Sequence, residues 1–114
     1  ERQVNMNSKL VSIIIGLWIG TSWISAAFAA DASAGKALFE KSCAGCHGAD
    51  GKGNEKMATI LGVKSLSIVA KDTTKKSDEQ LLKVIAEGEG KMPSSKLTKA
   101  EQKQALDYAR TLAK

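Results

Sequence analysis

The chain has 114 residues, of which 43% are hydrophobic and 25% are charged, and its formal net charge is +5. This length allows one domain, and the near-average composition gives no indication of disorder or low complexity. The chain has no run of five or six like charges and little aromatic interleaving. The basic excess therefore does not predict nucleic-acid binding.

The first 29 residues are predicted to be a secretory signal peptide. Lys9 is followed by 21 uncharged residues, and Ala27-Phe28-Ala29 has the small-x-small form of a cleavage site. Residues 30–114 are then exported to the periplasm or an equivalent compartment. The alternative is a leader retained as an anchor, since about 20 apolar residues suffice to cross a bilayer. In that case only the leader contacts the membrane, and the domain faces the periplasm.

Residues 30–114 carry a net charge of +4 and only two aromatic side chains, Phe39 and Tyr108. A domain this small buries about two-thirds of its unfolded surface and is only marginally stable unless it is reinforced. With so few large side chains, the predicted hydrophobic core is not filled by the protein alone. A large planar apolar cofactor would fill the remaining space.

Four helical segments and no strand are predicted, which indicates an all-α fold. Two of the helices begin with capping boxes, Ser77 with Gln80 and Thr98 with Glu101. Residues 62–76 are expected to be irregular. The predicted helices cover about 32–42, 55–61, 77–87 and 98 to the C-terminus.

Cys43, Cys46 and His47 form a C-x-x-C-H motif, which is the signature of covalent c-type haem attachment. On a helical turn, side chains at positions i, i+3 and i+4 project to one side. Each thiol can then add to one haem vinyl group while the imidazole reaches the iron from the same side of the ring. The motif predicts one covalent haem c with His47 as an axial iron ligand.

Three other uses of these residues fit less well. A disulfide between Cys43 and Cys46 would close too small a loop to stabilise much, and it would leave His47 without a role. A thioredoxin-like site requires a βαβ unit nearby. A zinc site requires four ligands, whereas the chain contains no other Cys or His.

The second axial ligand is predicted by elimination. His47 is the only histidine, so bis-His ligation within one chain is excluded, and Met/His ligation is usual in electron-transfer haems. Met57 follows His47 by only ten residues and lies in a helical segment, where Met is ordinary core filler. Met92 precedes Pro93, the only proline, which favours an extended backbone at Met92. We expect Met92 to bind the iron, with Met57 as the alternative.

Four features together resemble the class I monohaem cytochrome c family, and its small soluble bacterial and algal members in particular. They are, in chain order, Gly35-x-x-x-Phe39, the C-x-x-C-H motif, Gly90-Lys91-Met92-Pro93 and Tyr108-Ala-Arg-Thr-Leu112. The resemblance implies an all-α fold of three or four helices around one covalent haem. It also implies that the first and last helices cross, with Gly35 and Phe39 meeting Leu106 and Tyr108, and that the protein carries electrons and is not an enzyme.

Two parts of the haem surroundings are left open by the sequence. Many family members have a proline near the carbonyl that holds the histidine ring, but residues 48–70 contain none. The hydrogen-bond acceptor that His47 needs for its other ring nitrogen is therefore not identified. For the haem propionates, the candidate partners are Lys64, Ser65 and the backbone amides of residues 62–70.

The predicted function is single-electron transfer between a donor and an acceptor redox protein outside the cytoplasmic membrane. A haem enzyme or gas sensor with a labile Met92 is one alternative, although no second histidine, no distal arginine near the site and no paired carboxylates are evident to favour it. A subunit of a larger oxidase or dehydrogenase complex is another. The lysines that flank the haem-bearing loops are either a docking ring for an acidic partner or a solvated surface; they are Lys52, Lys56, Lys91 and Lys96.

Overall fold

The computed structural model describes residues 25–114, with side chains from Asp31 onward. Asp31–Lys114 form one compact unit. The predicted leader, residues 1–29, lies almost entirely outside the described residues and stays a prediction. No helix in the described part of the chain is long and apolar enough to cross a membrane.

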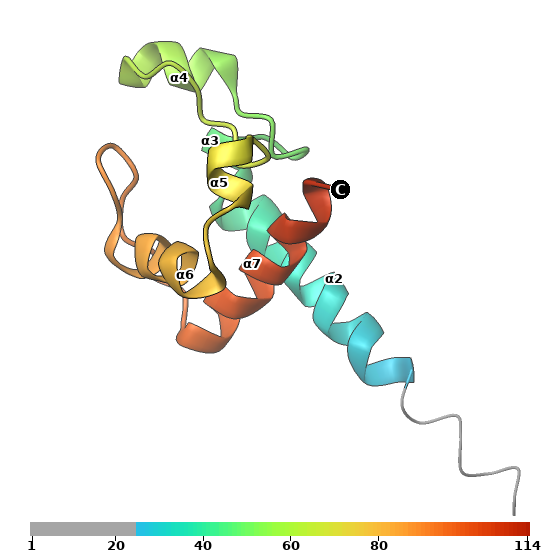
Figure 1. The fold of residues 1–114 in the computed structure, drawn as a ribbon. Helices are drawn as coiled ribbons and strands as arrows, with labels where there is room; N and C mark the ends of the chain where they lie inside the picture. Colours follow the sequence, from blue (N-terminus) through green and yellow to red (C-terminus); the bar gives the residue numbers. More distant parts are fainter. Residues whose placement is uncertain (1–24) are drawn as a thin grey trace, which may run out of the picture. The chain divides into compact units, whose positions relative to one another are not determined.

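The described residues form helices joined by loops (Figure 1). Between residues 25 and 114 no strand is formed, and one isolated β-bridge pairs Glu89 with Met92. The all-α prediction is therefore confirmed. The helices are α2 (Ser25–Ser42), α3 (Ala44–His47), α4 (Glu55–Leu61), α5 (Lys71–Thr74), α6 (Asp78–Glu87) and α7 (Lys99–Leu112).

The helices α6 and α7 begin at the predicted capping boxes. The Ser77 hydroxyl accepts a hydrogen bond from the Gln80 backbone N–H, and the Gln80 side chain accepts one from the Ser77 N–H. Thr98 and Glu101 repeat this reciprocal pattern at the start of α7. Each box satisfies backbone donors that have no partner inside the helix, and so it fixes where the helix starts.

Two elements differ from the sequence prediction. The helix α2 begins at Ser25 instead of near residue 32, because the intervening residues are rich in alanine, the strongest helix former. The helix α5 is a single turn inside the stretch predicted to be irregular. Its four residues, Lys-Asp-Thr-Thr, carry no apolar periodicity that would have revealed it.

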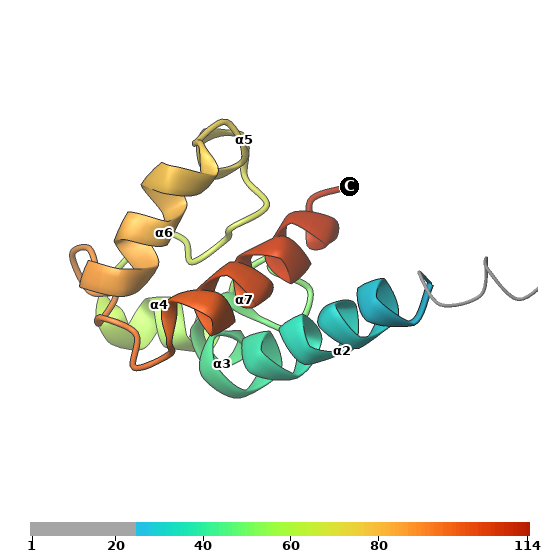
Figure 2. The same cartoon turned by 90° about the horizontal axis from the view of Figure 1, so that it is seen from below.

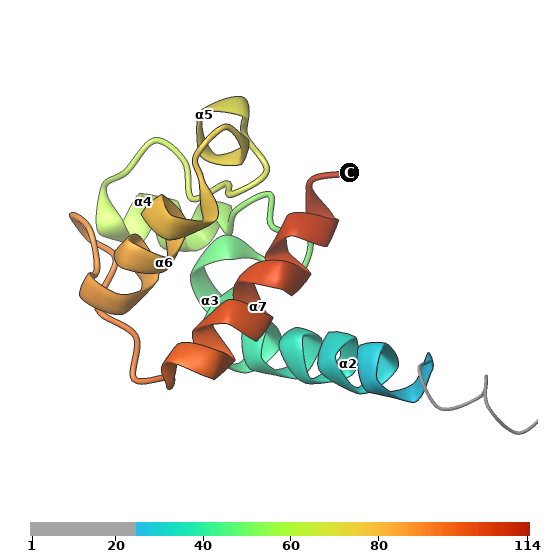
Figure 3. The same ribbon diagram turned by 60° about the horizontal axis from the view of Figure 1, so that its bottom comes forward.

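The helix α7 crosses the C-terminal half of α2 (Figures 2 and 3). Gly35 lies at the crossing, where a Cβ atom would clash with the Gln104 carbonyl oxygen and would lie 3.2 Å from Tyr108 Cβ. One helical turn on, the Phe39 and Tyr108 rings pack with their centroids 5.5 Å apart and their planes inclined by 57°. The predicted crossing of the first and last helices is confirmed, with Gln104 as an additional contact.

The fully buried apolar core is small. Among residues 31–114 it consists of Phe39, Ala58, Ala105 and Leu106, and Phe39 is 2% exposed. The helix α6 packs against α7, yet none of its side chains is fully buried. Its apolar side chains instead border a cavity.

Candidate functional site

A cavity of about 340 Å³ lies within the compact unit, which is in the usual range of roughly 300–1,000 Å³ for ligand pockets. Cys43, His47 and Met92 all line it. Cys46 and Met57 do not line it, and both are half-buried. The rest of the wall is largely hydrophobic and includes Phe39, Val63, Leu66, Ile68, Leu81, Val84, Ile85, Leu97 and Leu106.

The C-x-x-C-H motif spans the junction of α2 and α3. The Cys43 N–H donates to the Phe39 carbonyl at 2.8 Å, and the His47 N–H donates to the Cys43 carbonyl at 3.0 Å. After α3 the chain turns back, because the Asn54 N–H donates to the Cys46 carbonyl at 2.9 Å. The Asn54 side-chain amide also donates to the Gly45 carbonyl at 3.2 Å. The backbone of the motif is thus fixed on both sides.

The His47 ring is oriented by a backbone carbonyl. Its Nδ1 lies 2.7 Å from the Leu66 carbonyl oxygen, so Nδ1 carries the proton and donates it. The Ile68 N–H donates to the Gly51 carbonyl at 2.9 Å and holds the Leu66 segment in place without a proline. This leaves Nε2 as the nitrogen available to a metal, and a histidine hydrogen-bonded in this way is a more basic ligand.

The environment of Cys43 does not resemble that of a redox-active cysteine. Cys43 and Cys46 are not joined in a disulfide. Burial raises the pKa of the Cys43 thiol, and the neighbouring Cys46 adds to the rise. Reactive C-x-x-C cysteines have a lowered pKa instead. Within residues 25–114, no group of three or more His, Cys, Asp or Glu side chains is placed to hold a metal ion.

Met92 lies on a tight turn that is fixed to α6. The Glu89 and Met92 backbones exchange hydrogen bonds of 3.0 and 2.9 Å, and the Ser95 N–H donates to the Ile85 carbonyl at 2.9 Å. Gly88 has φ +80°, and a Cβ atom there would lie 2.5 Å from the Met92 carbonyl oxygen. Met92 forms an isolated antiparallel β-bridge with Glu89.

Several residues of the cavity wall are polar or charged. Of the candidate propionate partners, Ser65 lines the cavity and Lys64 does not. Arg110 on α7 also lines the cavity and brings a positive charge to it, so the expectation that no arginine lies near the site is wrong. The other polar lining residues are Ser67, Thr73, Thr74, Lys76, Glu89 and Lys91.

These residues fit a covalently attached haem. The cavity offers the Cys43 thiol, an imidazole with Nε2 available and the side chain of Met92, and its walls are mostly apolar. One cavity-lining thiol, a single histidine and a methionine do not suit zinc, whose structural sites use four nitrogen or thiolate ligands. They do suit the histidine and methionine ligation of cytochrome haems.

The comparison with known families identifies a c-type cytochrome domain. Residues 30–108 match the family described as cytochrome c oxidase, cbb3-type, subunit III. No curated protein matches the chain. The match covers more than half of the chain and includes the C-x-x-C-H motif, Met92 and the crossing of α2 with α7. The protein therefore belongs to this family of c-type cytochrome domains, and it is a haem-based electron-transfer protein rather than an enzyme.

Proposed function

We propose that the protein carries single electrons on one haem c, joined by thioethers to Cys43 and Cys46, with His47 and Met92 as the axial iron ligands. The observation that carries this proposal is the convergence of Cys43, His47 and Met92, which are up to 49 residues apart, on one largely apolar cavity. When bound, haem c supplies a centre that gains or loses one electron.

Each part of the chain has a defined role in this proposal. The Leu66 carbonyl holds the His47 ring at Nδ1 and presents Nε2 to the iron. The turn at residues 89–92 presents the Met92 thioether, a ligand that raises the reduction potential. The largely apolar walls would limit the contact of the haem with water, and two protein ligands would leave no open coordination position for a substrate.

The assignment of Met92 is tested by paired substitutions. We expect Met92→Ala to abolish the weak sulfur-to-iron charge-transfer absorption of the oxidised protein, because the thioether is lost. Met57→Ala is the control and should retain this absorption, because Met57 does not line the cavity. The reverse pattern would show that the two methionines had been assigned wrongly.

The number of haem groups and their covalent attachment are measured by mass spectrometry of the denatured protein. We expect the mass of the polypeptide plus one haem, and a single remaining thioether after either Cys43→Ala or Cys46→Ala. Haem that dissociates from the unsubstituted protein on denaturation would contradict covalent attachment.

Export of the protein remains part of the proposal. Edman sequencing of the purified protein should give a free amino terminus at Ala30, as expected for a cleaved leader. An amino terminus at Met6 would exclude cleavage and favour a membrane-anchored protein. In both cases the proposed site of electron transfer is outside the cytoplasmic membrane.

We propose that four exposed lysines steer an acidic redox partner toward the haem. All four side chains are exposed, and Lys91 also lines the cavity. Steering by charge accelerates encounter and is weakened by salt. A rate of electron exchange that is insensitive to ionic strength would eliminate this docking role. The lysines are Lys52, Lys56, Lys91 and Lys96.

A second candidate function is electron transfer as a subunit of an oxidase. It is favoured by the matching family, which is that of subunit III of cbb3-type cytochrome c oxidase. The two candidates differ in native mass: a diffusible carrier elutes alone, whereas an oxidase subunit co-purifies with its complex. Gel filtration of gently solubilised membranes, followed by haem staining, distinguishes them.

A further inference from the structure

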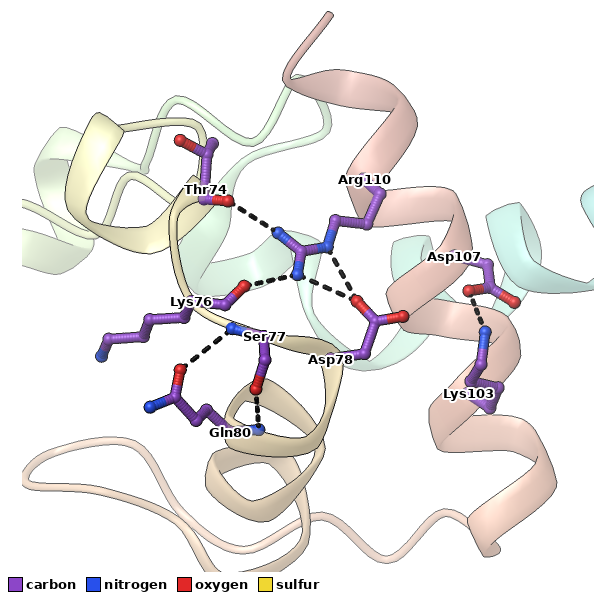
Figure 4. Close-up of polar contacts among 8 residues, drawn as sticks. All are labelled: Thr74, Lys76, Ser77, Asp78, Gln80, Lys103, Asp107 and Arg110. Atoms are coloured by element: carbon purple, nitrogen blue, oxygen red, sulfur yellow. Dashed lines mark hydrogen bonds and ion pairs between the residues drawn. The ribbon is translucent and has the colours of Figure 1, made fainter.

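Arg110 on α7 makes four hydrogen bonds to residues 74–78, which run from the end of α5 to the start of α6 (Figure 4). Nε and Nη2 donate to Asp78 Oδ1 at 3.1 and 2.9 Å. Nη1 donates to the Thr74 carbonyl at 3.1 Å, and Nη2 donates to the Lys76 carbonyl at 2.7 Å. These acceptors precede Arg110 by 32 to 36 residues, and Arg110 is the only arginine in residues 31–114.

Only one of the two charges in the Arg110–Asp78 ion pair lies in the cavity wall. Arg110 lines the cavity and its side chain is 29% exposed, whereas Asp78 does not line it and is 46% exposed. The other Lys and Glu residues that line the cavity, Lys76, Glu89 and Lys91, are exposed. Solvent screens exposed charges more strongly than partly buried ones. Among the Lys, Arg and Glu side chains in the wall, the charge of Arg110 is therefore the one that solvent screens least.

We propose that Arg110 raises the reduction potential of the haem and that Asp78 limits this rise by compensating the guanidinium charge. This inference rests on the proposed function, which places the haem in this cavity. Reduction transfers one electron from a donor protein to the haem, lowers the charge of the haem by one unit, and forms or breaks no bond. A positive charge in the wall therefore favours the reduced form.

A purely structural role for the ion pair predicts a different result. Arg110 also holds the carbonyls of Thr74 and Lys76, so its loss could simply loosen the wall and admit water. Water favours the more highly charged oxidised haem, because charge is better solvated in a polar medium. Loosening would then lower the potential whether Arg110 or Asp78 is replaced. The charge compensation that we propose gives shifts of opposite sign.

The test is a redox titration of the haem-loaded protein and three variants. We expect Arg110→Gln to reduce the equilibrium constant for reduction by about threefold, which is ~28 mV for a one-electron couple. We expect Asp78→Asn to raise the potential, because Asn keeps an acceptor oxygen for Arg110 but removes the compensating charge. The matched control is Asp107→Asn. Asp107 pairs with Lys103 on the same helix (Figure 4), and neither residue lines the cavity, so the potential should change less than in Asp78→Asn.

The outcomes separate the inference from the proposed function. A normal haem c spectrum with an unchanged or lowered potential in Asp78→Asn overturns the inference and leaves the proposed function standing. A protein that attaches no haem overturns both. If Arg110→Gln does not fold, Asp78→Asn against Asp107→Asn decides the matter alone: a larger rise in Asp78→Asn supports compensation, and an equal or smaller one refutes it.

Discussion

Met92 is held in position by the backbone of the residues beside it. The turn from Glu89 to Met92 is closed by two backbone hydrogen bonds, and the Gly88 N–H donates to the Val84 carbonyl at 2.8 Å. Gly88 packs so closely against residues 92–94 that no side chain fits between them. The position of the thioether thus depends on a glycine four residues away.

Replacing Gly88 with Ala should displace Met92. The φ of +80° is unfavourable for alanine, and its Cβ would lie 2.5 Å from the Met92 carbonyl oxygen. We expect a loss of about 3 kcal/mol in the free energy of unfolding, measured by denaturant titration, with weakening of the sulfur-to-iron absorption. Gly90→Ala is the control: Gly90 has φ +57° with open space around it, so it should lose about 1 kcal/mol and retain the absorption.

At the scale of the helices, the start of α7 contains an acid-sensitive contact. Hydrogen bonds from the Thr98 backbone and side chain lower the pKa of Glu101 below its ordinary value of 4.5. Because the folded-state pKa lies below the unfolded-state value, ionised Glu101 stabilises the fold above the unfolded-state pKa. That stabilisation is lost as the pH falls through the folded-state pKa.

We therefore expect Glu101→Gln to be less stable than the unsubstituted protein at neutral pH, with the difference shrinking below the ordinary pKa of 4.5. The measurement is the free energy of unfolding of both proteins from neutral pH to below pH 4.5. Gln80→Ala in the α6 capping box is the control, because Gln80 does not titrate. The loss of stability caused by Gln80→Ala should be the same at neutral pH and below pH 4.5. If the effects of the two substitutions changed with pH in the same way, the role of the Glu101 charge would be contradicted.

The crossing of α2 and α7 depends on the missing side chain of Gly35. Gly35→Ala would place a Cβ against the Gln104 carbonyl, and we expect a loss of about 1–3 kcal/mol in the free energy of unfolding from overpacking. Gly45→Ala is the matched change in open space, and it should alter stability by less than about 0.5 kcal/mol. If Gly35→Ala and Gly45→Ala lowered the melting temperature equally, the close approach of α2 and α7 at Gly35 would not be what makes the Gly35 substitution destabilising.

At the scale of the whole molecule, the cofactor has to complete the core. A largely apolar cavity of about 340 Å³ leaves the side chains that line it without packing partners on one side. In a small domain, which is only marginally stable, the missing contacts are a substantial loss. The protein made without haem should therefore retain helical far-ultraviolet circular dichroism but lose cooperative thermal unfolding. A sharp melting transition at the temperature of the haem-loaded protein would contradict this expectation.

The sequence predicts the parts of the fold that have local signals. The helices α6 and α7 carry capping boxes and apolar periodicity, and they begin at the predicted residues. The crossing of α2 and α7 was implied by the family pattern around Gly35, and it is present. The haem site was predicted from a contiguous motif, and the structure adds that Met92 lines the cavity with His47 whereas Met57 does not.

The rest of the site depends on contacts between distant residues. The single turn α5 has no periodic pattern, and the partners of Arg110 lie 32 to 36 residues earlier, with two of them backbone carbonyls. A carbonyl belongs to every residue, so no residue type marks the ones that accept these bonds. Only the folded chain identifies them.

Because every residue has a backbone carbonyl, the hydrogen bond of His47 tolerates point mutation of its partner residue. Its Nδ1 donates to the main-chain carbonyl of Leu66, so no amino-acid substitution at position 66 removes the acceptor. A bulky or polar side chain there would still disturb the packing. In a histidine paired with a carboxylate, by contrast, one missense mutation removes the partner. The orientation of the His47 ring therefore does not depend on which residue type occupies position 66, as long as the backbone of residues 66–68 keeps its path.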